Sequence, residues 1–293
     1  MHCPYCQSPN EPAFRYDARM TVCASCGAWF VWPPQTAASI REHYDRNTAG
    51  MPDELREWRI DTSQEKWYEH LARRIARKPA ARNIAAVVDV GAGGLELTVS
   101  LAREFQRVRV EAWDLFADGF DRVVPSDASG RISCRRVDLN RLDEASVPQG
   151  SFDVVACVAV IEHVLDPLAL LRFLHSITAP GGFAYVVGPE VTSAAHRLMQ
   201  KFWPYYCPDE HLTLPSLASI ERAVAIAGGG AFQLRRVNVH YSLKYLMRFL
   251  HFPIPVPAWM DFLLPIPAGA FELVWEKPKD DLYRPTTTTT ARH

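Results

Sequence analysis

Four cysteines near the start of the chain have the spacing of metal ligands. Cys3 and Cys6 form one CxxC pair, Cys23 and Cys26 form another, and sixteen residues separate the two pairs. Because two CxxC turns present four thiolates to one tetrahedral ion, the spacing predicts a zinc ribbon. Four cysteine ligands leave no open coordination position, so this zinc is expected to be structural.

Two disulfides are the alternative for these cysteines. No signal peptide precedes the motif and the chain has seven cysteines, so a reducing cytoplasm is the simpler environment and zinc is favoured. Redox chemistry at a lone CxxC is disfavoured because the two pairs occur together.

An acid followed by a glycine cluster is the second chemical signal. The stretch VVDVGAGGLE places Asp89 near the end of an apolar run and then Gly91, Gly93 and Gly94. A strand with an acid at its tip, then a glycine turn and a helix, is how doubly wound α/β proteins bind nucleotide-like ligands. An ordinary strand-to-helix turn is the alternative, since Leu95 stands where a third regular glycine is common.

Two more acids close the next two apolar runs. Asp114 ends the run VRVEAWD, and a carboxylate there offers two acceptor oxygens to the hydroxyls of a ribose. Asp138 follows the run over 132–137, where capping of the next turn is the alternative role.

These residues require a sheet to bring them together. Apolar β-rich runs alternate with helical periods, which predicts a mostly parallel sheet with helices on both faces. The expected strands cover 87–90, 108–114, 132–137, 152–158, 183–188, 232–239 and 270–275, and the expected helices include 96–104, 215–227 and one opened by Glu162 and His163.

From 84 to 190 the order and spacing of these pieces resemble a class I S-adenosylmethionine-dependent methyltransferase. The matching pieces are VVDVGAGG, EAWD, RRVDL, FDVVACVAVIEHVLDP and LRFLHSITAPGGFAYVV. A dinucleotide-binding dehydrogenase would share the first two, but the pairing of FD with EHVLDP is typical of methyltransferases. The resemblance implies a doubly wound, mostly parallel, seven-stranded Rossmann-like sheet with a small N-terminal zinc-binding module.

The resemblance also implies which residues bind S-adenosylmethionine. The glycine turn would approach its methionine part and ribose, the acids would accept from ribose and adenine, and the end of the fourth strand would offer backbone to the ammonium group. A small buried apolar residue is the alternative role of Cys157. The implied residues are Asp89, Gly91, Gly93, Gly94, Asp114, Leu115, Asp138, Leu139, Cys157 and Val158.

Two histidines are candidate general bases. His163 follows Glu162, and His211 lies in the run DEHLT, which resembles a recurring feature of the same family. A histidine of near-neutral pKa can take a proton from an attacking hydroxyl, whereas complementing a helix N-terminus is the structural alternative for this pair. Some related quinone-type enzymes carry an acid at the position of Ala159 that helps bind a metal, so catalytic magnesium is not expected.

The expected domains are a zinc ribbon (1–35), a helical extension (36–82), a methyltransferase domain (83–278) and a disordered tail (279–293). Within the third, 83–190 would bind the cofactor and 191–278 would form the substrate region and last strands. The aromatic stretch around Trp203, Tyr205 and Tyr206 suits either an acceptor pocket or helix packing. The proline-broken stretch 249–267 is too interrupted to span a membrane, although it suits peripheral contact or core packing.

Composition narrows the acceptor. The 293 residues carry a formal net charge of −1, and an RNA binder normally shows a basic excess or stripe. We therefore expect a cytoplasmic enzyme that methylates an oxygen or nitrogen of a small molecule, sugar or secondary metabolite. An RNA methyltransferase that uses its zinc module for RNA recognition and a non-catalytic cofactor-binding scaffold are the alternatives.

Overall fold

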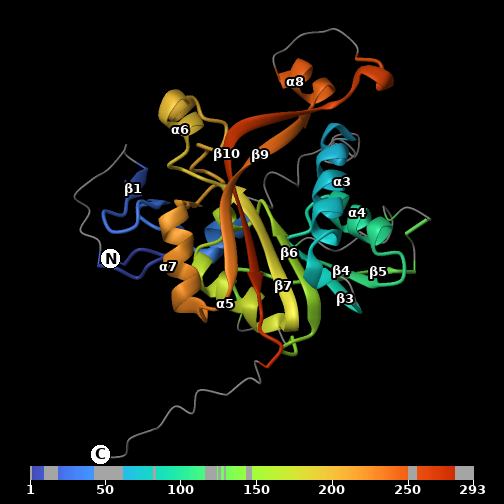
Figure 1. The fold of residues 1–293 in the computed structure, drawn as a ribbon. Helices are drawn as coiled ribbons and strands as arrows, with labels where there is room; N and C mark the ends of the chain where they lie inside the picture. Colours follow the sequence, from blue (N-terminus) through green and yellow to red (C-terminus); the bar gives the residue numbers. More distant parts are fainter. Residues whose placement is uncertain are drawn as a thin grey trace, which may run out of the picture.

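A central seven-stranded sheet organises the computed structural model of the chain (Figure 1). The structure describes residues 2–9, 19–42, 62–81, 84–115, 124, 127–128, 130–142, 147–249 and 256–280. The strands of this sheet are β3 (Ala86–Val90), β4 (Arg109–Asp114), β5 (Ile132–Arg136), β6 (Phe152–Val158), β7 (Thr178–Pro189), β9 (Phe232–Ser242) and β10 (Leu263–Glu276).

The strand order is β5-β4-β3-β6-β7-β10-β9. The first five strands are parallel, whereas β10 is antiparallel to both β7 and β9. The doubly wound, mostly parallel sheet expected from the sequence is confirmed. In such a sheet the carboxyl ends of β3, β4, β5 and β6 meet at one edge, where this fold binds its ligand.

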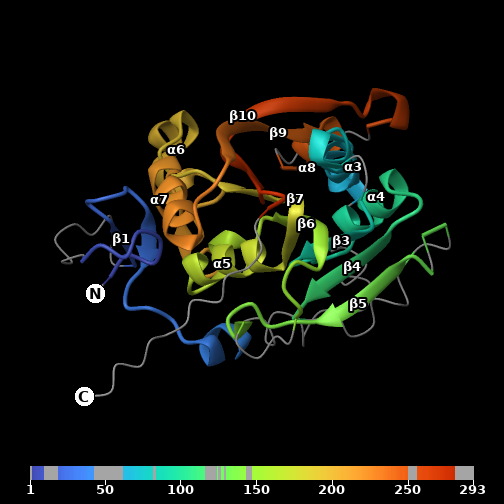
Figure 2. The ribbon, with the colours of Figure 1, turned by 60° about the horizontal axis from the view of Figure 1, so that its bottom comes forward.

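Helices cover both faces of the sheet (Figures 1 and 2). The helices α3 (Thr62–Ala76) and α4 (Glu96–Glu104) bury apolar side chains against one face. On the other face lie α5 (Pro167–Ile177) and α7 (Leu217–Ala227). Helix α7 begins with a capping box formed by Ser216 and Ser219 and ends at Gly228.

The N-terminal segment completes its own small sheet with a strand from the distant insertion after β7. The strands β1 (Met20–Val22) and β2 (Trp29–Val31) pair antiparallel, and β2 also pairs with β8 (Thr213–Leu214). The same insertion carries α6 (Ala194–Met199) and the 3-10 turn η6 (Gln200–Phe202). Buried side chains of the cysteine segment (2–9 and 19–31) belong to the same hydrophobic core as those of α5 and α7.

Strands β9 and β10 are longer than the expected 232–239 and 270–275. Beyond Ala270, toward its start, β10 has left β7 and pairs with β9 alone, so Pro265 and Pro267 interrupt no ladder between two neighbours. Because proline is rare inside strands, the sequence does not predict this part of β10. The expected turn APGG likewise forms an irregular start of β7, where pairing with β6 shifts register.

The two long strands lead to α8 (Leu243–Phe249) and the 3-10 turn η7 (Ala258–Met260). Part of the stretch expected to contact a membrane, 250–255, lies outside the described residues, as do 281–293 of the expected tail. Among its described residues, Trp259 is 83% and Phe262 is 53% exposed. Within the described ranges, every helix is too short or too polar to cross a bilayer.

A buried carboxylate ties α3 to the sheet. Glu272 on β10 is 1% exposed and lies 2.6 Å from the guanidinium of Arg74 and 3.6 Å from the Lys78 amine. It also accepts from the Tyr185 hydroxyl at 2.5 Å and from Arg235 at 2.8 Å. Burial by itself raises the pKa of Glu272, but the Tyr185 hydrogen bond and these cations hold the pKa below its ordinary value.

We predict that Glu272→Gln lowers the free energy of unfolding by about 3 kcal/mol at pH 7, because it leaves partly buried cations without their anion. A carboxyl whose folded-state pKa is depressed stabilises the fold above its unfolded-state pKa and loses that effect as pH falls through the folded-state pKa. The two proteins should therefore converge in urea denaturation at acid pH. Glu276→Gln, at the exposed end of the same strand, is the matched control, and equal stability of all three at pH 7 would contradict the prediction.

Candidate functional site

The glycine turn after β3 is fixed by the end of β4. The backbone N–H groups of Gly91 and Ala92 both donate to the carbonyl of Trp113, at 2.8 and 3.0 Å. Gly91 has φ of +77°, and a Cβ atom there would lie 2.4 Å from a methyl group of Val160. The position therefore requires glycine, and the turn lies directly against the segment that leaves β6.

Leu95 keeps the backbone shape that the missing glycine would supply. Its φ is +71°, a left-handed conformation that few residues other than glycine adopt. Its buried side chain packs with Val99 and Ala112. Helix α4 begins at the next residue, so the departure from the regular glycine spacing leaves the strand-turn-helix geometry unchanged.

Asp89 lies near the end of β3, just before the turn, and is 2% exposed. Its Oδ2 accepts from the Thr98 hydroxyl at 2.7 Å. Burial, together with the nearby charges of Asp114 and Glu96, raises the pKa of Asp89 to about 7, although the Thr98 hydrogen bond lowers it. The group therefore titrates near neutrality, unlike an exposed aspartate.

The other two acids lie at the neighbouring strand ends. Oδ2 of Asp114 accepts from the N–H of Gly93 at 3.0 Å, so this carboxylate lies against the glycine turn. Oδ1 of Asp138 accepts from the N–H of Asn140 at 2.9 Å, which is the turn-capping role considered above. Leu115 and Leu139, which follow the two acids, are both half-buried, and 116–123 lie outside the described residues.

The end of β6 faces the same place. Cys157 is fully buried, and its thiol pKa is raised by burial first and then by the charges of Glu162 and Asp89. Val158 ends the strand, and Ala159 has φ of +55° where the chain leaves the sheet. The structure thus gives Cys157 a buried position near two carboxyl groups.

Glu162 and His163 belong to a 3-10 turn, η5 (Ile161–His163), and the expectation that they open a helix is wrong. Helix α5 begins at Pro167, and its N-cap is Asp166, whose side chain accepts from Ala169. The proline explains the difference, because it disfavours helical backbone in the residue before it. Glu162 and His163 are therefore free of a capping role at a helix N-terminus.

Glu162 is a buried acid with an unsatisfied oxygen. The side chain is 2% exposed, and its Oε2 has no hydrogen-bond partner among the described residues. Burial raises the pKa of Glu162 to about 8, so the neutral acid predominates at pH 7. A Cβ atom on Gly188 would lie 3.4 Å from this oxygen, so the glycine leaves space beside it.

His163 and His211, far apart in sequence, meet edge to face with ring centroids 4.7 Å apart. Nδ1 of His163 lies 3.0 Å from the carbonyl of Glu210, and Nδ1 of His211 lies 2.6 Å from that of Tyr205. A carbonyl accepts only, so both Nδ1 atoms carry the proton and each Nε2 is the basic nitrogen.

The environment keeps both imidazoles neutral. Burial lowers the pKa of His163 to about 3, with a further contribution from His211, and burial also lowers the pKa of His211. A carboxylate oxygen of Glu162 and one ring nitrogen from each of the two histidines all lie within 4.8 Å of one another. The two candidate bases and a neutral acid thus form one cluster. Magnesium prefers oxygen ligands, so a set with two imidazoles does not suit it.

Tyr68 on α3 also lies near this site, although no sequence motif points to it. The pKa of its phenol is raised by burial first and then by the charges of Glu96, Asp89 and Glu162. It therefore lies near both the glycine turn and the acidic end of the histidine cluster. Its helical spacing with Trp67 and Leu71 indicates packing and does not predict a position near the glycine turn and Glu162.

Two aromatic residues of the insertion are hydrogen-bonded to the long strands β10 and β9. Trp203 is buried and donates from Nε1 to the carbonyl of Ala268 at 2.7 Å, so it packs the insertion against β10. The Tyr205 hydroxyl lies 3.1 Å from that of Tyr241, and burial followed by the charge of that neighbour raises the pKa of Tyr205.

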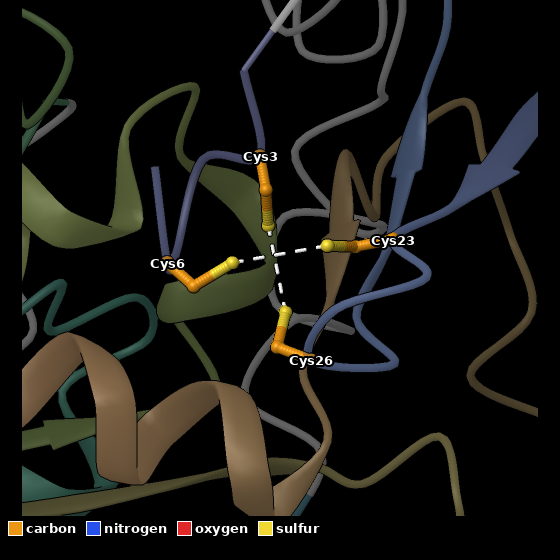
Figure 3. Close-up of side chains that lie close together, drawn as sticks. All are labelled: Cys3, Cys6, Cys23 and Cys26. Carbon is orange, nitrogen blue, oxygen red and sulfur yellow. Dashed lines mark hydrogen bonds between the residues drawn. The ribbon is translucent and has the colours of Figure 1, made fainter. Parts of the chain in front are cut away.

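The four N-terminal cysteines converge on one point, as Figure 3 shows. The Sγ atoms of Cys3 and Cys26 are 3.6 Å apart, and those of Cys6 and Cys23 are 3.8 Å apart. Four sulfurs about 2.3 Å from a tetrahedral zinc would be separated by roughly 3.8 Å. The donor set and its spacing therefore fit zinc and are too wide for disulfides.

The two CxxC turns have matching backbones. Gln7 donates its N–H to the carbonyl of Cys3 at 3.0 Å, and Gly27 donates to that of Cys23 at 2.8 Å. Both residues have positive φ, +56° and +74°. Such paired turns direct two sulfurs each to a shared centre, as zinc knuckles do.

Comparison with known proteins places this geometry in a family. The family model described as "Methyltransferase domain" matches residues 60–228. A curated relative from Xanthomonas campestris pv. campestris, named ubiquinone biosynthesis O-methyltransferase, is 35% identical over 132 residues. That match covers 44% of this chain and 52% of the relative, so the chain spans about half the length of the curated relatives it matches.

Solved structures agree at the level of the fold. The apo S-adenosylmethionine-dependent methyltransferase SibL aligns with a TM-score of 0.54 and 19% identity, over 83% of this chain and 69% of its own. An O-methyltransferase family protein from Burkholderia thailandensis aligns with a TM-score of 0.52 and 13% identity, over 75% and 59%. With the family match over more than half of the chain, these findings show that the protein belongs to the class I S-adenosylmethionine-dependent methyltransferases.

Proposed function

We propose that this protein transfers a methyl group from S-adenosylmethionine to an oxygen of a small acceptor, with a nitrogen acceptor as the variant. The carrying observation is the cluster of two neutral imidazoles and a buried acid beside the glycine turn. The O-methyltransferase name of the curated relatives supports oxygen. Sugars and secondary metabolites remain within this acceptor class.

The glycine turn and its acids fit the donor. We assign the methionine part and ribose to Asp89, Gly91, Gly93 and Gly94, the ribose hydroxyls to Asp114 with Leu115, the adenine to Asp138 with Leu139, and the ammonium group to Cys157 and Val158. A sulfonium and an ammonium are cations, so Asp89, whose burial has raised its pKa, is a suitable partner: binding would restore its charge.

The histidine cluster would serve the acceptor. S-adenosylmethionine supplies an electrophilic methyl group, and the acceptor oxygen forms the new bond to carbon as the sulfur–carbon bond breaks. The hydroxyl proton passes to Nε2 of His163 or His211, which the carbonyls behind Nδ1 keep in the basic tautomer. In-line positioning would contribute most, up to roughly 7–11 kcal/mol of the barrier.

The cysteine cluster would hold a structural zinc, supported by its four thiols and their separations. We infer that the zinc ribbon (1–35), the helical extension (36–82) and the methyltransferase domain (83–278, divided at 190) act together, and a cytoplasmic location stays a prediction. For peripheral membrane contact, the exposed Trp259 and Phe262 offer the apolar surface.

We predict that affinity for S-adenosylmethionine rises about tenfold from pH 6 to pH 8. Asp89, with a pKa of about 7, is mostly protonated at pH 6 and must lose its proton to bind a cation. Calorimetry should show that Asp89→Asn binds S-adenosylmethionine more weakly than the wild type. Any pH dependence that comes from titration of S-adenosylmethionine itself is the same for both proteins, so the tenfold rise should be missing from the variant alone. Absence of binding by the wild type would refute the donor assignment, and Asp114→Ala should weaken binding at every pH.

We predict about one zinc per chain by metal analysis, as a single four-thiolate site requires. Cys26→Ser should lower the zinc content, whereas Cys134→Ser, outside the cluster, should leave it unchanged. A folded wild-type protein without zinc would overturn the assignment.

With an aliphatic hydroxyl acceptor, His163→Gln or His211→Gln should lower kcat by about 10²-fold, the lower end for a general base because burial has lowered the pKa of both rings, and leave affinity for S-adenosylmethionine within about twofold. A phenol, being more acidic, should lose less. His175→Gln is the control, because its ring stacks on Trp275 at the opposite edge of the sheet. Unchanged kcat in both site variants would exclude them as bases.

The acceptor panel should compare free phenols and alcohols, the same groups carried in vesicles, and structured RNA. Greater turnover of vesicle-borne acceptors that is lost in Trp259→Ser would support the peripheral contact. Methylation of RNA with tight, salt-sensitive binding would favour the RNA alternative. Donor binding without methylation of any acceptor would favour the scaffold.

A further inference from the structure

A shared peptide group connects the N-terminal segment to the turn that carries Glu162 and His163. The N–H of Val31 on β2 donates to the carbonyl of Leu212 at 2.9 Å. The N–H of Leu212 in turn donates to the carbonyl of Glu162 at 2.7 Å. Residue 212 is thus held between the cysteine segment and the candidate active-site turn.

A second series of hydrogen bonds, which involves side chains, connects the same two parts of the protein. Tyr5, between two of the cysteines, is fully buried, and its hydroxyl lies 2.9 Å from that of Thr213. The Thr213 hydroxyl donates to the carbonyl of Ile161 at 3.2 Å. Because that proton is used, the Tyr5 hydroxyl must donate to Thr213. The chain ends on the first residue of the turn η5.

Both histidines depend on this same stretch of backbone. His211 directly precedes Leu212, and His163 is oriented by the carbonyl of Glu210. A displacement of 210–213 would therefore move one imidazole and remove the orienting acceptor of the other. The serine that follows, Ser216, also donates to the carbonyl of Cys26 at 2.5 Å.

The part of the site assigned to S-adenosylmethionine has hydrogen bonds of its own. The glycine turn is held by the carbonyl of Trp113, and Asp89 by Thr98. The Asp114 side chain accepts from the N–H of Gly93, and its carbonyl accepts from the N–H of Val137. None of these hydrogen bonds involves residues 2–9 or 19–31.

We propose that the cysteine module positions the acceptor half of the site, with Tyr5 as the positioning residue. The proposal rests on the proposed function and adds a division of labour: an intact module sets kcat and leaves donor binding unchanged. Tyr5 touches neither donor nor acceptor in this scheme. It acts through Thr213 on the turn that carries Glu162 and His163.

The decisive variant is Tyr5→Phe, which keeps the ring, its burial and all four cysteines while it removes one hydrogen bond. Small misplacements of catalytic groups cost up to about 100-fold in rate, so we expect kcat to fall about tenfold. Zinc content and the Kd for S-adenosylmethionine should stay at wild-type values. Thr213→Val should reproduce the loss, and Thr213→Ser, which keeps the hydroxyl, should restore kcat.

Arg19→Ala is the matched control. Arg19 pairs with Asp209 across the same two segments, but on the surface, where such pairs contribute little. Wild-type kcat in Arg19→Ala together with the loss in Tyr5→Phe supports positioning through the buried chain. Wild-type kcat in Tyr5→Phe, or an equal loss of donor affinity and zinc, would overturn the proposal.

A spectroscopic readout separates this proposal from the proposed function. The side-chain ¹⁵N resonances of His163 and His211 should shift in Tyr5→Phe and remain in place in Arg19→Ala. If the wild type fails to bind S-adenosylmethionine, the proposed function fails and these resonances still test the coupling. If they do not move in Tyr5→Phe, the positioning role is refuted whatever the acceptor.

Discussion

The antiparallel pairing of β2 with β8 is the interaction on which the arrangement of the site depends. It joins residues near the start of the chain to an insertion almost two hundred residues later, and it does so with backbone hydrogen bonds. Backbone groups buried away from water must be paired, so the cysteine segment and the insertion each supply the hydrogen-bond partners that the other requires. The turn carrying Glu162 extends this network by one further hydrogen bond.

Buried acids of this sheet differ in their electrostatics. Near the carboxyl edge, burial raises the pKa values of Asp89 and Glu162. Glu272, equally buried, is surrounded by Arg74, Lys78 and Arg235 and stays ionised. Two buried glutamates thus differ in charge: Glu162 is mainly neutral at pH 7, whereas Glu272 is an anion. Perturbed acids of the first kind are typical of functional sites.

The sequence was sufficient for the parallel strands because the central ones, β3, β6 and β7, are rich in apolar residues, and because Asp114 and Asp138 mark the ends of the runs that contain β4 and β5. It was insufficient for β9 and β10, since their outer halves contain prolines and polar residues that only a two-stranded ribbon tolerates. The misplaced helix start at Glu162 shows a similar limit: the periodicity of IEHVLDPLALL was continuous, and the break came from Asp166 and Pro167.

For the site, sequence patterns located residues that follow strands and missed those that arrive from elsewhere. Tyr68 lies on a helix, where an aromatic residue indicates only packing, and Tyr5 lies between two cysteines whose CxxC spacing gives no role to the residue between them. Neither the meeting of His163 with His211 nor the shared peptide of Leu212 is encoded locally. Both arise from long-range pairing.

Leu95 has a consequence for how such turns vary. A left-handed backbone costs a residue with a side chain roughly 1–2 kcal/mol relative to glycine. Burying a leucine returns roughly 1.5–3 kcal/mol, and the bulkier residue also has less unfolded-state freedom to lose. The two choices are therefore nearly balanced in free energy. What the turn preserves is a set of dihedral angles, and a search by shape would find relatives that a search by glycine letters passes over.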